Sequence, residues 1–380
     1  MTVTAPSCDF RTHFASVKDP RVQRTKFHQL IDILFISVAA TIAGADGPTD
    51  IAEFAREKLA WCRKFVALKN GVPSHDTIGR VLSLIKPAPF QKAFLDWIAS
   101  FARECEEDGE PRFIPIDGKT LCGSGGGKDR ENPLHVVSAW ATKQGLTLGQ
   151  VAVNSKSNEI TAIPTLLDML ELSGAIISID AMGCQKEIAR KIVDGGGDYN
   201  LAVKDNQPHL SDAIKDFFLQ RHKNQDFGDH GCRQHRTVER SHGRIVSREY
   251  FIAPVPESMK HYCRDWKKLT SIGQVCTTTD CGGKQTGDTR YYISSRQPRA
   301  KEFARSARGH WSIESMHWIL DVVFGEDSSR LRNGDVTENF GFLRKFVIGL
   351  LKRDTSRGSL KGKRKRAAWS TKFLEKLLFG

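Results

Sequence analysis

The chain has 380 residues, of which 39% are hydrophobic and 27% are charged, and it carries a net charge of +13 at pH 7. A chain of this length can bury a large core in two or three structural units. The longest apolar run, residues 33–45, is shorter than the roughly 18 residues of a membrane span, and the N-terminus lacks a signal-peptide pattern. We therefore expect a cytoplasmic protein without a membrane partner, and the nine scattered cysteines favour reduced thiols.

The positive charge is concentrated at the C-terminal end. Residues 341–380 hold 12 Lys and Arg against 2 Asp and Glu, a balance of +10 that leaves +3 of the total +13 for the preceding 340 residues. The densest stretch runs from Lys361 to Arg366, so residues 351–380 are interpreted as a basic tail. Such a tail suits a polyanion, with nucleic acid ahead of a membrane surface, although charged tails are often only solvated.

The first hundred residues predict an all-helical domain over residues 10–105. Apolar periodicity and turn residues place helices at 22–44, 49–66, 74–84 and 89–105. Gly44 is expected to end the first helix, and Ser74 to cap the third. Short helices joined by tight turns allow two interpretations, a DNA-binding helix-turn-helix over residues 61–85 or an ordinary helical bundle.

An α/β pattern over residues 112–350 follows an acidic linker at 106–110. Short apolar runs predict strands at 113–117, 134–140, 146–153, 175–180 and 199–204, with helices at 160–172 and 185–193. Three consecutive strands followed by helix, strand, helix and strand is the element order of an RNase H-like, or retroviral-integrase-like, core. The fold class expected is therefore α/β, with an RNase H-like catalytic core preceded by the helical domain.

Residues 205–290 interrupt this alternation and predict a β-rich insertion. A polar helix at 207–220 leads into strand-like pieces at 235–240, 244–253, 269–276 and 289–295. Arginines flank the turn Ser241-His-Gly243, so a hairpin here would form a basic prong suited to the DNA backbone, or simply a solvated hairpin. The core then resumes with a long helix at 299–324.

Two predicted strands end in aspartate, at Asp117 and Asp180, and carboxylates at such strand ends open into the crevice where α/β sheets bind ligands. The long helix places His310, Glu314, His317 and Asp321 on one face because they are spaced four, three and four residues apart. Glu314 either pairs with His317 or joins the two aspartates. We favour the second interpretation and assign Glu326 and Asp327, beyond Gly325, to capping or surface roles.

Three carboxylates together form a set of hard oxygen ligands, which Mg²⁺ or Mn²⁺ prefers when it acts on phosphates. Two such ions can activate an attacking hydroxyl and stabilise the leaving oxygen in an in-line phosphoryl transfer. Asp117, Asp180 and Glu314 are therefore the candidate catalytic and metal-binding residues. A phosphate loop at Gly123–Lys128 has the wrong spacing, and a zinc site built on His230, His235 and the nearby cysteines lacks a Cys-x-x-Cys pair.

Four motifs occur in order along the chain: Ile116-Asp-Gly-Lys-Thr120, Ile179-Asp-Ala-Met-Gly-Cys-Gln185, Asp198-Tyr-Asn-Leu-Ala-Val-Lys-Asp-Asn-Gln207 and His310-Trp-Ser-Ile-Glu314. Together they resemble bacterial insertion-sequence transposases of the DDE class, nearest to the ISAs type that includes the H-repeat-associated proteins. The resemblance covers about residues 19–351. It implies an RNase H-like core, a helical N-terminal domain and a β-rich insertion before the glutamate, with Asp117, Asp180 and Glu314 at the three catalytic positions.

The resemblance further implies cleavage at transposon ends and strand transfer into target DNA, with double-stranded DNA as the partner. A homodimer on paired ends and a nucleoid-associated place in a bacterial cytoplasm are also expected. Candidate DNA contacts are Lys119, Lys204, Arg240, His242, Arg244 and His310. The pattern departs from broader relatives, which tend to have Tyr, Arg and Lys where this chain has Ala307, His310 and Asp321. Two other classes stay open, a stand-alone metal-dependent nuclease and an inactive transposase-derived DNA-binding protein.

Overall fold

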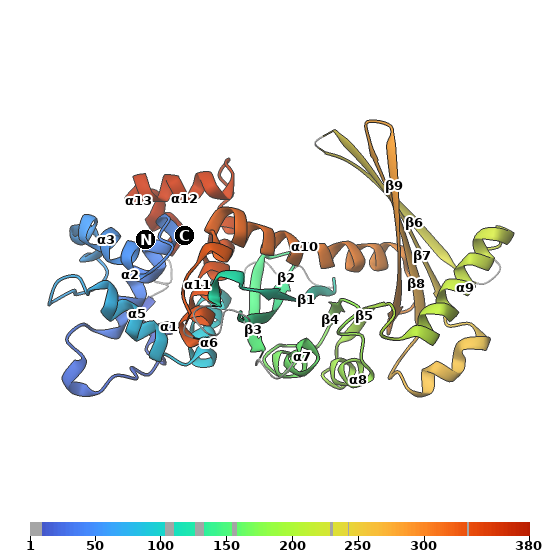
Figure 1. Ribbon diagram of the computed structural model, residues 1–380, viewed down its shortest axis with the longest axis horizontal. Helices are drawn as coiled ribbons and strands as arrows, with labels where there is room; N and C mark the ends of the chain where they lie inside the picture. Colours follow the sequence, from blue (N-terminus) through green and yellow to red (C-terminus); the bar gives the residue numbers. More distant parts are fainter. Residues whose placement is uncertain are drawn as a thin grey trace, which may run out of the picture.

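The computed structural model describes residues 10–102, 110–125, 133–153, 158–228, 231–241, 243–332 and 334–380. The molecule is elongated, with a helical bundle at one end, a sheet in the middle and long β-hairpins at the other end (Figure 1). One long helix, α10 (Ala300–Phe324), runs between these parts. Nearly all of the predicted acidic linker, part of the glycine-rich turn, and His242 lie outside the described residues.

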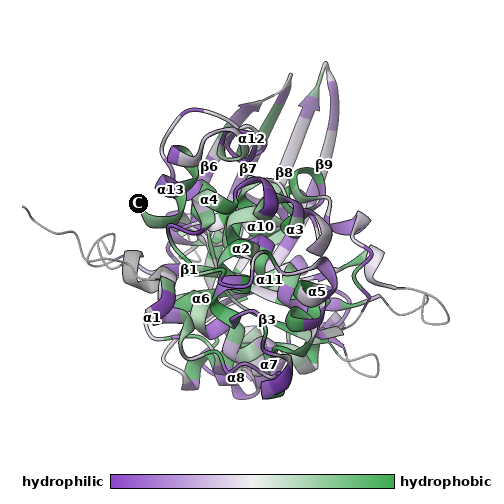
Figure 2. Cartoon of the chain, turned by 90° about the vertical axis from the view of Figure 1, so that its left-hand side faces the viewer, coloured by the Kyte–Doolittle hydropathy of each residue, from purple (hydrophilic) through white to green (hydrophobic). Residues whose placement is uncertain are grey.

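The bundle combines helices from both ends of the chain. Its helices are α1 (Phe10–Phe14), α2 (Leu30–Ala43), α3 (Pro48–Glu57), α4 (Leu59–Cys62), α5 (His75–Leu84), α6 (Pro87–Ala102), α11 (Gly334–Arg353), α12 (Leu360–Trp369) and α13 (Thr371–Phe379). One hydrophobic core joins them to the second half of α10. Phe346 of α11, for example, packs against Phe94 and Trp97 of α6, with ring centroids 4.4 and 5.1 Å apart. Hydrophobic residues gather in this interior, around α2, α10 and α11 (Figure 2).

The helix ends bear out two local predictions. Gly44 ends α2 in a left-handed conformation with φ 119°, and Ser74 Oγ accepts a hydrogen bond from the backbone N–H of Thr77. The first helix begins later than predicted, at Leu30, and the second is divided at Lys58. Residues 63–74 between α4 and α5 exceed the roughly three- or four-residue turn of a helix-turn-helix, so the bundle interpretation is favoured.

The basic C-terminal segment is folded, so its interpretation as a tail is wrong. It forms the end of α11 followed by α12 and α13, whose apolar side chains lie in the bundle core. Lys363 is buried and pairs with Asp354 at 3.2 Å, and the Arg364 guanidinium lies 4.1 Å from the centre of the Phe324 ring. Other cations of α12, including Lys365, remain exposed. The sequence prediction missed this because charge density obscured an amphipathic pattern.

A single sheet of nine strands forms the rest of the molecule, in the order β3-β2-β1-β4-β5-β9-β8-β7-β6. The strands are β1 (Arg112–Thr120), β2 (His135–Ala141), β3 (Leu146–Val153), β4 (Ala175–Ile179), β5 (Asp198–Val203), β6 (Arg233–Ser241), β7 (Arg244–Pro254), β8 (Ser271–Cys281) and β9 (Lys284–Ser294). Strands β1, β4 and β5 are parallel, and every other neighbouring pair is antiparallel. The predicted insertion is β-rich, and β9 pairs with β5, so the insertion extends the core sheet.

Helices cover both faces of this sheet. On one face, α7 (Glu159–Asp168), α8 (Lys186–Asp194) and α9 (Pro208–Asn224) pack over a core of strand residues. On the other face, the start of α10 packs on β7, β8 and β9 through Phe303, Ala304 and Ala307. The helix also crosses β1 and β4. The sheet therefore supports α10 along its length, and α10 in turn joins the sheet to the bundle.

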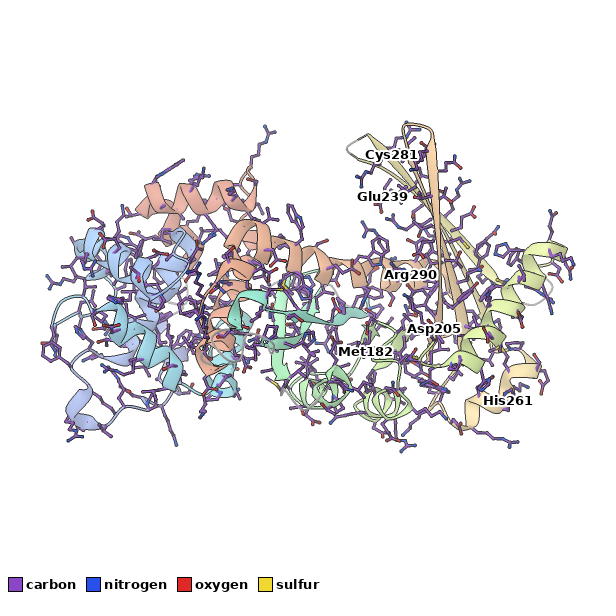
Figure 3. All side chains as sticks on the ribbon, in the orientation of Figure 1. Met182, Asp205, Glu239, His261, Cys281 and Arg290 are labelled. Carbon is purple, nitrogen blue, oxygen red and sulfur yellow. The ribbon has the colours of Figure 1, made fainter. Side chains whose placement is uncertain are left out.

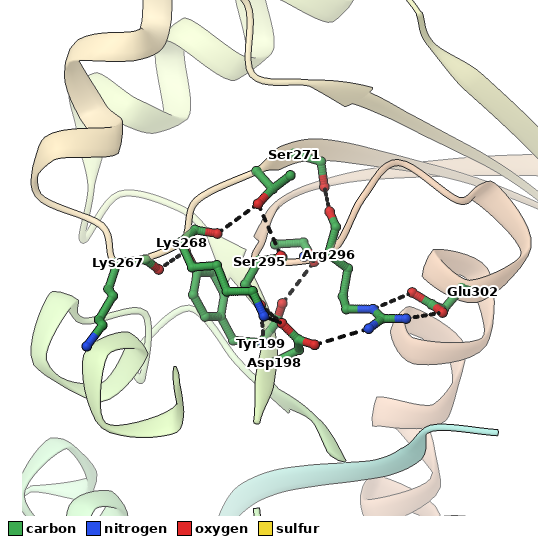
Figure 4. Close-up of polar contacts among 10 residues, drawn as sticks. Asp198, Tyr199, Lys267, Lys268, Ser271, Ser295, Arg296 and Glu302 are labelled. Atoms are coloured by element: carbon green, nitrogen blue, oxygen red, sulfur yellow. Dashed lines mark hydrogen bonds and ion pairs between the residues drawn. The ribbon is translucent and has the colours of Figure 1, made fainter. Parts of the chain in front are cut away.

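A polar network fixes the start of α10 against the sheet (Figure 4). Arg296 donates two hydrogen bonds of 2.8 Å to Glu302 in the first turn of α10 and a third, of 3.2 Å, to Asp198 at the start of β5. Asp198 also accepts from Lys268 at 2.7 Å and from Ser295 at 2.6 Å. Burial opposes ionisation of Asp198, but these donors hold its pKa below the ordinary value. The aspartate that opens the third sequence motif is thus a structural anchor.

Polar side chains of α11 at its contact with the sheet predict a pH-dependent stability. Lys345 donates to Ser138 and Gln150, and burial raises the pKa of the neighbouring Glu338 from its ordinary 4.5 to about 7. The folded chain therefore binds this proton more tightly than the unfolded chain, and the stability contributed is full below pH 4.5 and lost as the pH rises to about 7. Glu338→Gln should remove this loss, about 3 kcal/mol, in urea unfolding compared at acidic and at neutral pH. Parallel profiles for the two proteins would contradict this assignment.

In the part of the chain that the structure describes, no single helix is long and apolar enough to cross a membrane, and only the bent pair α2 and α3 reaches that length and composition together.

Candidate active site

Asp117 lies near the end of β1, next to the central parallel strands. His317 on α10 holds it, with 3.4 Å between His317 Nδ1 and Asp117 Oδ2. Burial opposes ionisation of Asp117, yet the hydrogen bond and charge of His317 keep the pKa of this carboxyl below its ordinary value. His317 therefore pairs with Asp117. The alternative prediction, in which His317 pairs with Glu314, is not what the structure shows.

Asp180 directly follows β4, the parallel neighbour of β1. Its Oδ1 accepts a hydrogen bond of 3.3 Å from the backbone N–H of Gly183, in the turn that leads to α8. Burial raises the pKa of Asp180, and the charges of Glu159 and Asp117 raise it further. The parallel pairing of β1 with β4 thus brings both strand-end aspartates to the same edge of the sheet, as predicted.

Glu314 completes this group from the middle of α10. It lines a cavity of about 240 Å³ together with Asp117, Asp180 and His310. Burial raises the pKa of Glu314, with the charge of Asp117 adding to the effect and Arg290 opposing it. Asp117 is therefore the carboxylate whose charge acts on both of the others.

The three carboxylates line the cavity without converging on one point. Among the described residues, no group of three or more His, Cys, Asp or Glu side chains is already placed to hold a metal ion. The repulsion that raises the pKa of Asp180 and of Glu314 is the kind that a bound cation relieves. The donor set therefore fits hard divalent ions, with Asp117 in the central position.

His310 lies on the wall of the cavity, with its Nδ1 3.2 Å from Ser178 Oγ on β4. Burial lowers its pKa, although the charges of Asp117 and Asp180 act in the opposite direction. A neutral imidazole can donate or accept a hydrogen bond here but supplies no fixed positive charge. Lys204, another predicted DNA contact, lines the same cavity just beyond the end of β5 and is exposed.

Lys119 lies in a buried ion-pair cluster, away from the residues that line the cavity. Only 9% of this residue is exposed, and its Nζ donates to Asp321 at 2.7 Å and to Asp327 at 3.2 Å. Burial opposes its charge, but these two partners raise its pKa above the ordinary value. This position does not suit the predicted DNA contact. It also gives Asp327 and Asp321 a structural role.

The predicted surface or capping role of Glu326 is wrong, because this residue is only 1% exposed. Gly325 ends α10 in a left-handed conformation with φ 59° and turns the chain back toward the bundle. Glu326 Oε1 then lies 3.7 Å from Arg344 Nη1 of α11. Burial of an acidic residue beyond a helix end has no local sequence signal, since it depends on α11.

Lys119→Met tests whether this lysine acts in folding or in DNA binding. Loss of the ammonium leaves Asp321 and Asp327 side by side without their shared partner, and both are partly solvated, so we expect a loss of about 2 kcal/mol in unfolding free energy. DNA affinity should stay unchanged in a filter-binding titration at two salt concentrations. If the variant instead binds DNA more weakly and with less salt dependence, and its stability is unchanged, Lys119 contacts DNA as predicted.

The β-insertion contacts α10 through Trp311, three residues before Glu314. The guanidinium groups of Arg248, Arg290 and Arg308 lie 5.0, 5.1 and 5.4 Å from the centre of its ring. Glu239 of β6 lies 3.1 Å from both Arg248 and Arg308, which joins the hairpin to the helix. Figure 3 shows Glu239 on the hairpin and Arg290 lower down, where β9 passes α10.

The predicted basic hairpin is present as β6 and β7, and it projects away from the body of the molecule (Figure 1). Arg240 and Arg244 are both exposed near its turn. His242 falls in that turn, outside the described residues, so the structure says nothing about its predicted DNA contact.

The sequence interpretation missed several side chains near the carboxylates. His135 Nε2 and Glu159 Oε1 lie 2.7 Å apart, and His135 Nδ1 is 2.8 Å from Thr120 Oγ1. A Cβ atom at Gly118 would collide with both His135 and Glu159, so a larger residue after Asp117 would displace this pair. Glu159 and Arg290 stand in no recognisable motif, and neither was predictable from spacing.

Comparison with known proteins decides the family. Residues 11–98 match the family described as DDE_Tnp_1-associated, and residues 108–350 match the family described as Transposase DDE domain. The chain belongs to the DDE transposase family. The three carboxylates and all four sequence motifs lie within the second matched range. The predicted resemblance is therefore confirmed.

Similar proteins of this family occur in Escherichia coli. "Putative transposase YncI" of strain O157:H7 is 40% identical, covering 96% of this chain and 93% of that protein. "H repeat-associated putative transposase YhhI" of strain K12 is 37% identical over 97% of each chain. A solved structure, the piggyBac transposase synaptic complex with hairpin DNA, overlaps with a TM-score of 0.41 at 10% identity, over 98% of this chain and 81% of that one, which is too weak to establish a shared fold.

Proposed function

We propose that this member of the DDE transposase family cleaves DNA at transposon ends and transfers the freed strand into target DNA. The observation that carries the proposal is the single cavity lined by Asp117, Asp180 and Glu314. Two of these carboxylates come from adjacent parallel strands and the third from the helix that crosses them. Acidic groups brought together in this way are costly without a cation, so the arrangement indicates a site built for metal-assisted chemistry.

We also infer that residues 112–350 contain an RNase H-like core. Strands β1, β2 and β3 form an antiparallel meander, and β4 and β5 continue from β1 in parallel, with helices between them. The order of these elements agrees with the pattern from which the core was predicted. The helical domain over 10–105 and the insertion at about 205–290 are then additions to that core, and the second extends its sheet through β9.

Asp117, Asp180 and Glu314 would hold two Mg²⁺ or Mn²⁺ ions. Bound ions of this kind lower the pKa of an attacking hydroxyl and stabilise the leaving oxygen in an in-line displacement. His317 fixes one oxygen of Asp117, and His310 remains neutral beside Ser178. His317 thus orients Asp117, and the neutral His310 adds no positive charge next to the phosphate.

The reaction consists of two phosphoryl transfers. In the first, water attacks a phosphodiester at the transposon end, the bond from phosphorus to the 3′-oxygen breaks, and a 3′-hydroxyl and a 5′-phosphate form. In the second, that 3′-hydroxyl attacks a phosphodiester of target DNA, a new bond forms and the displaced strand leaves with its own 3′-hydroxyl. Neither step needs a covalent enzyme intermediate, since positioning and electrostatic stabilisation suffice.

Double-stranded DNA would contact exposed cations on both sides of the cavity. Arg240 and Arg244 lie on the projecting hairpin, Lys204 lies at the rim of the cavity, and α12 exposes Lys361 and Lys365 at the bundle end. A homodimer on paired ends and a place among the nucleoid of a bacterial cytoplasm remain part of this proposal, supported by the family.

Incubation of the purified chain with Mg²⁺ and a duplex that carries its candidate terminal repeats tests the proposal. We expect a nick at the repeat boundary and, with pre-cleaved ends, joined products in target plasmid. Nicking without joining would indicate a stand-alone nuclease. Binding without nicking in either Mg²⁺ or Mn²⁺ would indicate an inactive DNA-binding descendant.

A further inference from the structure

A phosphate at this cavity would bring negative charge next to three carboxylates. Two residues predicted to contact this phosphate do not balance its charge. Lys119 is paired with Asp321 and Asp327, and burial keeps His310 neutral. Beyond the proposed metal ions, fixed positive side chains that bind the non-bridging oxygens stabilise a phosphodiester substrate, and another residue of this chain can provide one.

Arg290 on β9 is in position to do so. Together with Asp117, Asp180 and Glu314 it lines the cavity. Its place follows from the sheet, because β9 pairs antiparallel with β5, and the last pair in register is Val203 with Tyr291. Arg290 and Lys204 therefore emerge next to one another, just beyond the edge where the carboxylates lie. The β-insertion thus delivers a guanidinium to a site whose acidic groups all come from the core.

The guanidinium of Arg290 is held in place before any substrate arrives. Its Nε donates to Asp288 Oδ2 at 2.9 Å, and its planar group lies 5.1 Å from the centre of the Trp311 ring. Burial opposes its charge, but Asp288 raises the pKa of Arg290, and Glu314 adds to this effect. A guanidinium fixed in this way loses little freedom when it binds an anion, and its fork suits two oxygens of one phosphate.

We propose that Arg290 contacts the phosphate that reacts in the cavity and offsets the charge of the carboxylates around it. This inference rests on the proposed function, since it takes a DNA phosphodiester as the substrate. The β-insertion then provides a residue that contacts the substrate.

A purely structural role for Arg290 is the competing explanation, because Arg248 and Arg308 contact the same Trp311 ring. Both of these arginines pair with Glu239. Neither is among the described residues that line the cavity. Arg308→Ala is therefore a matched control, since it removes a guanidinium from Trp311 without removing one from the cavity.

The first experiment measures binding alone. Duplexes that span the end of the terminal repeat, each with one phosphate replaced by a neutral methylphosphonate, are titrated in Ca²⁺ against the wild type, Arg290→Ala and Arg308→Ala. The wild type and Arg308→Ala should lose about 10-fold in affinity when the reacting phosphate is neutralised, and Arg290→Ala should lose nothing further at that position. If Arg290→Ala shows the wild-type loss at every position, or if the wild type shows none, the proposal is overturned.

The second experiment measures single-turnover cleavage with Mg²⁺. Arg290→Ala should cleave about 100-fold more slowly at saturating DNA, and Arg290→Lys should recover part of that loss because it keeps the charge. Melting temperatures of both variants equal to that of the wild type exclude a folding defect. Cleavage by Arg290→Ala at the wild-type rate overturns the proposal. If the wild type discriminates against the methylphosphonate but does not cleave, the contact stands and the proposed catalytic function fails.

Discussion

Asp117→Asn is expected to lower metal-dependent strand cleavage by about 1,000-fold while DNA affinity changes little. The amide keeps the shape of the carboxyl and a hydrogen-bond acceptor for His317, but it removes the charge that acts on both Asp180 and Glu314. The proposed metal site therefore loses one of its three charged ligands. Single-turnover cleavage of a terminal-repeat duplex in Mg²⁺, with affinity measured in parallel, gives the answer.

Asp168→Asn is the matched control for this substitution. Asp168 ends α7 and pairs with Lys191 at 2.7 Å, with 67% of its side chain exposed. The same chemical change there should leave cleavage within about a factor of two, because an exposed ion pair contributes little. Asp180→Asn should resemble Asp117→Asn. Full cleavage by either active-site variant, with intact binding, would show that the carboxylates do not hold the metal.

The position of the carboxylates could be predicted from the sequence because it follows from local rules. Asp117 follows Ile116, the last residue of β1 that pairs with β4, although β1 itself continues to Thr120. Asp180 follows Ile179 at the end of β4, so both aspartates lie at one edge of the parallel strands. Glu314 required only the helical repeat of α10. The same repeat placed His317 and Asp321 on that face, where they contact Asp117 and Lys119.

The partners of those residues could not be predicted, since they depend on long-range pairing. Arg290 reaches the cavity only because β9 pairs with β5 across more than eighty residues of chain. His135 and Glu159 meet over Gly118 because β2 and α7 pack on the same part of β1. No spacing rule connects these positions. The sequence indicated the three candidate carboxylates, whereas the basic and orienting groups around them emerged only from the fold.

For the C-terminal segment, the sequence interpretation was too simple. Its charge suggested a basic tail that binds a polyanion, but in the structure only some of its cations are exposed. Lys361 and Lys365 are exposed on α12, whereas Lys363 and Arg364 are buried against carbonyl groups and an aromatic ring. The amino-acid composition counts all four residues equally as positive charges. Only the packing of α12 and α13 into the bundle separates cations that are available to DNA from cations that stabilise the fold.

Leu374→Ala should therefore destabilise the protein by about 3 kcal/mol, as expected for a truncated core leucine. Leu374 is 0% exposed in the bundle core, whereas Trp369, five residues earlier, is 78% exposed. Trp369→Ala is the matched control and should change the unfolding free energy by less than about 0.5 kcal/mol. Guanidinium unfolding monitored by circular dichroism measures both variants. Unchanged stability of Leu374→Ala would mean that the segment is a free tail after all.

The DNA-binding part of the same segment can be tested separately. Replacing Lys361 and Lys365 together with alanine removes two exposed charges and leaves the buried Lys363 and Arg364 in place. If α12 contacts DNA, this double variant keeps the wild-type melting temperature, and the slope of log affinity against log salt falls by about two. Leu374→Ala, measured where it is still folded, should keep the wild-type slope. The two results together separate a helix that binds DNA through its exposed face from one that only completes the bundle, because either role alone changes one measurement and leaves the other unchanged.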